Sequence, residues 1–324
     1  MKTITKKNID WANSMIHWLS RPYVLLIAIA FIFTPVPHIA SALESGADFL
    51  NVEMGAKPGA MGSAYTAMSN DVNSIYYNTA GLAFMNKREI SFMHADGMMD
   101  NSYDFAAMAF PIKDFKAAFS FAKFSHGEFD TRSANRTSAG NFDAADMVLN
   151  FALARKLTNS SSLGVGIKFL SSNIANYSAN ALAFDMGLSQ RITAPMPLAL
   201  GISVKNLGYG MKFINEREHL PLSINAGVAI CIMSAINLSM DIKRMVYDKK
   251  TSISFGTEYN VMGGLSLRGG YSSMALDGGG NKDITGSLSG GIGLQTASNM
   301  TIDYSFTPMG EFESVNKLSL SYNF

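Results

Sequence analysis

Residues 145–157 read ADMVLNFALARKL, and in this stretch apolar residues alternate with small or polar ones. Successive side chains of a β-strand point to opposite faces. One face therefore carries Ala145, Met147, Leu149, Phe151 and Leu153. The opposite face carries Asp146, Asn150, Ala152, Ala154 and Lys156. A transmembrane β-strand needs about 9–11 residues, so the stretch predicts a strand long enough to cross a bilayer.

The same alternation recurs along the rest of the chain. It predicts strands near 88–98, 101–112, 115–127, 142–157, 161–177, 180–192, 198–213, 221–232, 235–246, 251–261, 265–275, 284–296, 299–309 and 313–324. An even number of strands suits a closed antiparallel barrel, because hydrocarbon requires every strand edge to be paired. Tight turns alternate with longer polar loops at 128–141, 214–220, 247–250 and 276–283, as is typical of outer-membrane barrels. We therefore predict an all-β fold, a transmembrane antiparallel β-barrel of about 14 strands over residues 88–324.

The polar face of these strands separates a membrane barrel from a soluble extracellular β-protein, which is the alternative. A soluble sandwich would expose long charged side chains, whereas this face is rich in Gly, Ala, Ser and Asn, which suit a crowded lumen. We expect its charges to pair across the lumen and brace the wall, because an unpaired buried charge is costly; a ring that selects solutes is the less favoured interpretation. These charged residues are Asp146, Asp185, Asp241, Glu258, Asp303, Lys168, Lys205, Lys243 and Arg268. Aromatic residues near strand ends on the apolar face predict interfacial girdles: Tyr259, Tyr271, Tyr304, Tyr322 and Phe324.

Composition excludes several classes of protein. Of 324 residues, 48% are hydrophobic and 16% are charged, which excludes a disordered chain. The net charge of +1 lacks the basic excess that nucleic-acid binding requires. The single cysteine, Cys231, forms no internal disulfide, and no Cys/His cluster has the spacing of a metal site. We expect no metal and no cofactor.

Residues 1–42 are predicted to be a cleaved signal peptide. A basic segment precedes the apolar run 23–33, which is too short for a transmembrane helix, and Ala40-Ser41-Ala42 supplies a cleavage site. A retained N-terminal anchor is the alternative. Cleavage leaves 22 basic and 24 acidic residues, a net charge of −2. The signal peptide and the predicted barrel together lead us to expect an exported protein of the outer membrane in a Gram-negative-type envelope.

Residues 43–87 are rich in Gly and Ala and do not alternate, which predicts a compact plug, or hatch, of turns and short helices in the barrel. Asn70-Asp71 is expected to form a turn or a helix cap ahead of residues 72–77. Met54, Met61, Met68 and Met85 would suit an adaptable apolar binding surface. The candidate ligand-binding residues of the hatch are Met61, Tyr65, Ile75, Tyr76, Tyr77 and Asn78.

Nothing in the sequence predicts an enzyme. His94, His126 and His219 are the only histidines after residue 42, and none has the spacing of a metal or catalytic motif. A Ser/His site on the wall, as in outer-membrane phospholipases, would need His94 or His126 beside a serine of a neighbouring strand. We regard this as a minor alternative.

The segments 59–65 (GAMGSAY) and 70–82 (NDVNSIYYNTAGL) resemble the signature GMGGA…DD…YWNPAGL of the PorV/PorQ family of outer-membrane proteins, which is related to FadL-type (OmpP1/FadL/TodX-like) barrels. Tyr77 and Thr79 depart from it, standing where the family has Trp and Pro. Further matching segments are 92–94, 174–179, 184–187 and 206–214. The C-terminal Phe324 resembles the signal read by the barrel-assembly machinery, which would make that machinery a partner.

The resemblance implies two functions. FadL-like members pass hydrophobic small molecules through a plugged barrel, by way of the hatch and a gap in the wall. PorV-like members bind exported proteins in type IX secretion, for which the loops 128–141, 214–220 and 276–283 would supply the surface. Both alternatives stay open, and both place the chain in a lipid bilayer.

Overall fold

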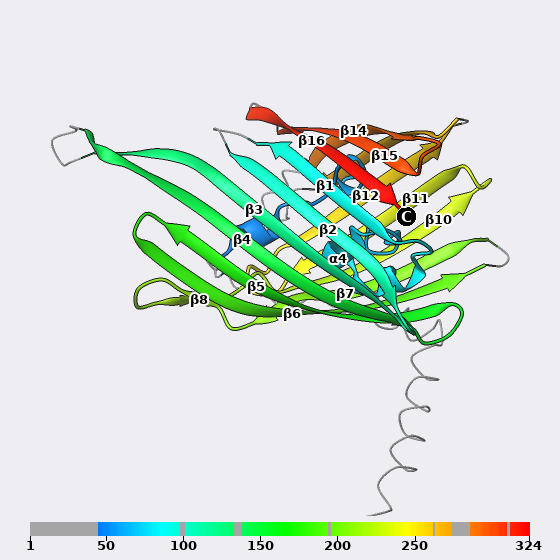
Figure 1. Ribbon diagram of the computed structural model, residues 1–324, viewed down its shortest axis with the longest axis horizontal. Helices are drawn as coiled ribbons and strands as arrows, with labels where there is room; N and C mark the ends of the chain where they lie inside the picture. The colour runs from blue at the N-terminus through cyan, green and yellow to red at the C-terminus, as the bar shows by residue number, and fades with distance from the viewer. Residues whose placement is uncertain are drawn as a thin grey trace, which may run out of the picture.

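The computed structural model describes residues 45–97, 101–132, 138–193, 196–261, 263–273, 286–309 and 312–324. Within them, fourteen antiparallel strands form a closed barrel (Figure 1), which confirms the predicted fold class. The barrel strands are β1 Glu89–Asp96, β2 Ser102–Ile112, β3 Phe115–Arg132, β4 Ser138–Lys156, β5 Ser161–Ile174, β6 Tyr177–Ile192, β7 Leu198–Gly208, β10 Ser223–Ile232, β11 Ile236–Met245, β12 Thr251–Asn260, β13 Leu265–Ser273, β14 Gly286–Gln295, β15 Met300–Met309 and β16 Phe312–Asn323. The short strands β8 Met211–Lys212 and β9 Arg217–Glu218 form a separate hairpin.

The barrel turns its apolar face outward. On β5, Leu163, Val165, Ile167 and Phe169 are 39–46% exposed, whereas Lys168 between them is buried in the lumen. Outward apolar and inward polar side chains are the reverse of a soluble sandwich. The strands therefore form a wall suited to lipid, and Tyr259, Tyr304, Tyr322 and Phe324 are exposed on its outer face as expected.

Three predicted strands, 115–127, 142–157 and 198–213, have different bounds in the structure. β3 and β4 continue through most of the predicted loop 128–141 as a ribbon, because a hairpin beyond the membrane needs no apolar face. The pairing of β2 with β3 ends at Ser102 and Ser125, so the tip of this ribbon, visible at the upper left of Figure 1, extends past β2. The predicted strand 198–213 ends at Gly208, where the chain leaves the wall to form β8 and β9.

The hatch, defined here as residues 45–87, lies inside the barrel (Figure 1). It consists of short helices and turns, as predicted: η1 Asp48–Asn51, α3 Ala56–Ala60, α4 Ser74–Tyr77 and η2 Thr79–Phe84. Of the expected turn or helix cap, the turn is observed: the Asn73 amide donates to Asp71 Oδ1 in an Asx turn, and among the described residues no side chain caps α4.

The lumen has two chemically different sides. The large apolar side chains that point inward come from β1–β5: Met93, Phe105, Phe124, Val148 and Leu170. Inward positions on β7 and β10–β16 carry mainly Ser, Gly, Asn and charged residues. We call these the apolar side and the polar side of the lumen. The hatch separates them and touches both.

No helix among the described residues is long and apolar enough to cross a bilayer. The predicted signal peptide, residues 1–42, lies outside the described residues, and its cleavage stays a prediction.

Candidate functional site

Polar side chains of the wall hold the backbone of the hatch in place. The amides of Tyr65 and Thr66 both donate to Asp241 Oδ2, at 2.9 and 2.7 Å. Because buried backbone groups need partners, these contacts replace the hydrogen bonds that short helices cannot supply. Further hatch backbone groups are bonded by Asn150, Ser162, Ser203, Ser289 and Ser319.

Glycines in the wall let the hatch backbone approach closely. A Cβ on Gly270 would lie 2.1 Å from the nitrogen of Gly62, and one on Gly201 would lie 2.3 Å from the oxygen of Thr66. No side chain fits at such distances. The small luminal residues noted in the sequence therefore form the seat of the hatch.

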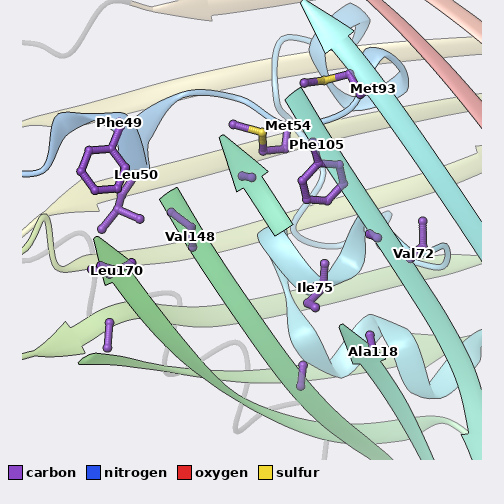
Figure 2. Close-up of a cluster of buried hydrophobic side chains, with 14 of the residues drawn as sticks. Phe49, Leu50, Met54, Val72, Ile75, Met93, Phe105, Ala118, Val148 and Leu170 are labelled. Carbon is purple, nitrogen blue, oxygen red and sulfur yellow. The ribbon is translucent and has the colours of Figure 1, made fainter. Parts of the chain in front are cut away.

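On the apolar side, hydrophobic residues of the hatch pack against the wall. Figure 2 shows Phe49, Leu50 and Met54 beside Phe105 and Val148. The rings of Phe49 and Phe124 lie 5.4 Å apart. Ile75, a candidate ligand-binding residue, belongs to this cluster and has no exposed surface. This contact is a closed apolar seam between hatch and wall.

Four other candidate residues form an aromatic cluster within the hatch. Met61, Tyr65 and Tyr77 are buried together, with Tyr76 packed against them. The ring centroids of Tyr65 and Tyr77 are 5.4 Å apart, and those of Tyr76 and Tyr77 are 5.1 Å apart. Burial raises the pKa of the Tyr65 and Tyr77 hydroxyls well above the usual value, so both stay neutral. The cluster presents rings rather than charges to its surroundings.

Asn78, the sixth candidate residue, joins the hatch to β6. Its Nδ2 donates to the carbonyl oxygens of Thr66 and Leu188, at 3.0 and 3.1 Å, and its Oδ1 accepts from the Ala80 amide. All its polar atoms thus have partners inside the protein. The structure gives Asn78 an anchoring position.

The expected luminal ion pairs form in two places. Lys168 Nζ lies 2.7 Å from Asp185 Oδ2 and donates to Asn206 Oδ1 at 2.7 Å. Arg268 lies 2.7 Å from both Glu258 and Asp303. Removal of one partner from such a buried pair leaves an uncompensated charge, so these groups brace the wall.

The hatch contributes Lys57 to the second group. Its Nζ is 3.6 Å from Asp71 and 3.9 Å from Glu258. Burial alone would lower the pKa of this lysine, but the two carboxylates outweigh burial and raise it. Lys57 is therefore a permanent cation at physiological pH.

The expected pairing fails for Lys205 and Asp241. Asp241 is used by the hatch amides, and among the described residues no carboxylate lies within 4.0 Å of Lys205 Nζ. Lys205 Nζ lies instead 4.0 Å from the ring centroid of Tyr76, a cation–π contact. Sequence alone does not reveal this, because cross-lumen neighbours depend on the stagger of the strands.

Two polar cavities adjoin the hatch. One, of about 290 Å³, lies at the strand ends near the C-terminus and includes Lys57, Glu89 and Arg268. The other, of about 210 Å³, lies toward the long loops and includes Tyr76, Lys205 and Asp241. Sequence reasoning missed the serine and asparagine residues of their walls, although each occupies an inward position of its strand.

The wall has an irregularity between β6 and β7. The register shifts between Phe184 and Met186, and Asn206 has a positive φ of 62°. The Asn206 amide donates to Asp185 Oδ1 at 2.8 Å, so the Lys168–Asp185 pair holds this bulge. Outside it, an apolar groove of about 670 Å³ is lined by Phe169, Leu182, Phe184, Leu207 and Tyr209.

The histidines have acidic partners. His94 Nδ1 lies 2.7 Å from Asp104 on the outer face, and His126 Nε2 lies 2.7 Å from Asp146 in the lumen. His219 stacks on Tyr247. Among the described residues, neither His94 nor His126 has a hydrogen bond to a serine, and no group of three or more His, Cys, Asp or Glu residues could hold a metal ion.

Comparison with known proteins identifies the fold. No family model matches the chain, and no curated protein matches its sequence. The chain is similar in structure to the toluene transporter TbuX of Ralstonia pickettii (12% identity, TM-score 0.61, covering 84% of this chain and 98% of that chain). It is also similar to the CymD monoaromatic hydrocarbon channel (13%, 0.62, 83% and 97%) and to a Pseudomonas aeruginosa FadL homologue (12%, 0.59, 83% and 98%). The fold is that of a FadL-type barrel.

The FadL-type fold confirms one half of the resemblance drawn from the sequence. These comparisons give no support to the other half, the PorV/PorQ family. TbuX is named as a toluene transporter and CymD as a monoaromatic hydrocarbon channel.

Proposed function

We propose that this protein is a non-enzymatic conduit for small hydrophobic molecules in the outer membrane. The observation that carries the proposal is the apolar side of the lumen, where Phe105, Phe124 and Leu170 point inward. A water-filled pore has a polar lining. An apolar wall inside a plugged barrel suits a solute that prefers hydrocarbon to water.

The proposed route begins at the long loops and follows the seam between the hatch and the apolar side. Seam residues Phe49, Leu50 and Ile75 would contact the solute as the hatch shifts. The bulge between β6 and β7 and the apolar groove outside it offer an exit through the wall. The structural likeness to hydrocarbon transporters supports this route.

Uptake of labelled toluene by a porin-depleted Gram-negative host tests the proposal. The intact protein should speed uptake of toluene but not of a sugar of similar size, and deletion of residues 50–80 should change the toluene rate. Phe124→Gln and Leu170→Gln should lower toluene uptake, because both polar groups would enter the apolar side. Thr301→Gln, on the polar side, is the matched control. Equal toluene uptake with and without the protein would refute the conduit.

A docking platform is the second candidate, in line with the PorV-like role in type IX secretion. The β3–β4 ribbon favours it. Among the described residues, those of β3 beyond Ser125 pair only with β4, and Phe129 stacks on Phe142. The ribbon would present this surface to an exported protein. Its deletion should abolish co-purification of that protein while the barrel stays folded; retention of the complex would exclude the platform.

A further inference from the structure

The cavity on the loop side of the hatch has a composition that the conduit does not use. Its volume is about 210 Å³. Serines from two wall strands line it, Ser252 and Ser254 of β12 and Ser272 and Ser273 of β13, together with Asn225. Met245 is its only aliphatic lining residue among those described. A hydrocarbon would leave these hydroxyl and amide groups without partners.

Lys205 is the chemically unusual member of this cavity. The residue is 7% exposed, and its ammonium contacts the Tyr76 and Tyr77 rings at 4.0 and 5.7 Å from their centroids. Among the described residues it has no hydrogen-bond acceptor, and no carboxylate lies within 4.0 Å of its Nζ. A buried ammonium without a counter-charge is costly, so an anion bound beside Lys205 would stabilise the protein.

The two carboxylates of the cavity lining are engaged with other partners. Lys243 Nζ donates to the neutral amide oxygen of Asn51 at 2.9 Å, so it also has no carboxylate partner there. Of the two lining carboxylates, Glu53 is paired with Lys317 at 3.3 Å, and Asp241 accepts the hatch amides. The lining therefore holds two ammonium groups and two carboxylates, and among the described residues neither Lys205 nor Lys243 has a carboxylate within 4.0 Å.

From these two ammonium groups without a carboxylate in contact, and from the hydroxyl-rich wall, we propose that this cavity binds a small hydroxylated monocarboxylate. The carboxylate would accept hydrogen bonds from Lys205 and Lys243. The ligand hydroxyls would bond to Ser254, Ser272 and Asn225, and the Tyr76 ring would form one side of the site. This site does not depend on the conduit, because it lies on the polar side of the lumen.

Titration calorimetry of the full chain in detergent tests the site, with gluconate as the probe. Sorbitol is the matched neutral compound, and hexanoate is a carboxylate of the same chain length without hydroxyls. Gluconate should bind at least tenfold more tightly than either, a difference of about 1.4 kcal/mol. Equal binding of gluconate and sorbitol would overturn the anion site, and equal binding of hexanoate would overturn the role of the hydroxyls.

Substitutions assign the binding to Lys205. Lys205→Gln should weaken gluconate binding at least tenfold, whereas Lys205→Arg, which keeps the charge, should retain it within about threefold. Lys87→Gln removes an exposed lysine outside the cavity and should have no effect. Heat-dependent gel mobility verifies that each variant is folded. Unchanged binding by folded Lys205→Gln, or no gluconate binding by the intact protein, would refute the proposal.

Discussion

Asp241 Oδ2 accepts a hydrogen bond from the backbone amide of Tyr65 at 2.9 Å, across 176 residues of sequence. The same oxygen accepts the Thr66 amide. One carboxylate on β11 therefore holds the middle of the hatch. Hydrogen bonds to a charged group contribute about 1.5–3 kcal/mol each.

Replacement of Asp241 by Ala should loosen the hatch. The Tyr65 and Thr66 amides would lose their acceptor, so we expect about 2–4 kcal/mol lower stability and faster proteolysis within residues 60–70. Urea denaturation in detergent and limited proteolysis measure the two effects. Asp114→Ala, at an exposed turn, is the control. Unchanged proteolysis in Asp241→Ala would show that other contacts suffice.

Adjacent glycines on β13 should respond differently to alanine. A Cβ on Gly270 would lie 2.1 Å from the hatch backbone, whereas one on Gly269 would meet only Thr257 Cγ2 at 3.6 Å. Gly270→Ala should cost about 1–3 kcal/mol, as overfilled interiors do, and Gly269→Ala should cost much less. Denaturation midpoints of the two variants check this. Equal midpoints would mean that the hatch can move away from β13.

The Lys168–Asp185 pair should be more costly to break than to replace. Asp185→Ala leaves a buried ammonium and removes the acceptor of the Asn206 amide, so a loss of about 3–5 kcal/mol is expected. The double variant Lys168→Met/Asp185→Leu should lose less. A double-mutant cycle by urea denaturation measures the coupling. If the losses of stability in the two single variants add up to the loss in the double variant, Lys168 and Asp185 do not stabilise the protein as a pair.

Stability should fall at high pH because of Tyr65. Burial, with the nearby Asp71 carboxylate, raises the pKa of this hydroxyl well above 10.0, so the unfolded chain releases the proton first. Stability is therefore complete below about pH 10 and is lost as pH rises toward the folded-state value. Denaturation midpoints from pH 8 to 11 should show this, and Tyr65→Phe should reduce the slope by about 1.4 kcal/mol per pH unit. If the slope of stability against pH is the same in Tyr65→Phe as in the intact protein, a titratable group other than Tyr65 causes the loss.

The C-terminal residue should matter for assembly more than for stability. Phe324 exchanges two backbone hydrogen bonds with Arg88, at 3.0 and 3.2 Å, where the first and last strands meet. Phe324→Ala keeps these bonds but removes the aromatic side chain proposed as the signal for the assembly machinery. Pulse labelling should show slower membrane insertion with an unchanged denaturation midpoint. Normal insertion would remove the proposed role of Phe324.

Alternation along each strand was enough to predict the barrel, because period two separates the lipid face from the lumen. Residues 145–157 illustrate this: Leu149 and Phe151 are exposed, and Asn150 is buried. The β3–β4 ribbon was missed because apolar and polar residues alternate only where one face of a strand meets lipid.

The candidate site was less predictable than the fold. Five of the six candidate hatch residues are buried, all but Tyr76, and their role in ligand binding stays a prediction. Their partners depend on contacts such as Asn78 with Leu188, 110 residues apart. Lys205 was assigned to the lumen and given an acidic partner, which the strand stagger does not provide. Asn206 was missed, because nothing local to it indicates that it completes the Lys168–Asp185 pair.

The position of the hatch also sets an order of events in folding. The hatch emerges first, yet the Ala56 amide donates to Ser319, 263 residues later, and Gly62 bonds to Ser289. Contacts of such sequence separation form slowly, since a long loop must close first. The hatch can therefore complete its bonds only after β14 and β16 have formed, so closure of the barrel and seating of the hatch are late, coupled steps.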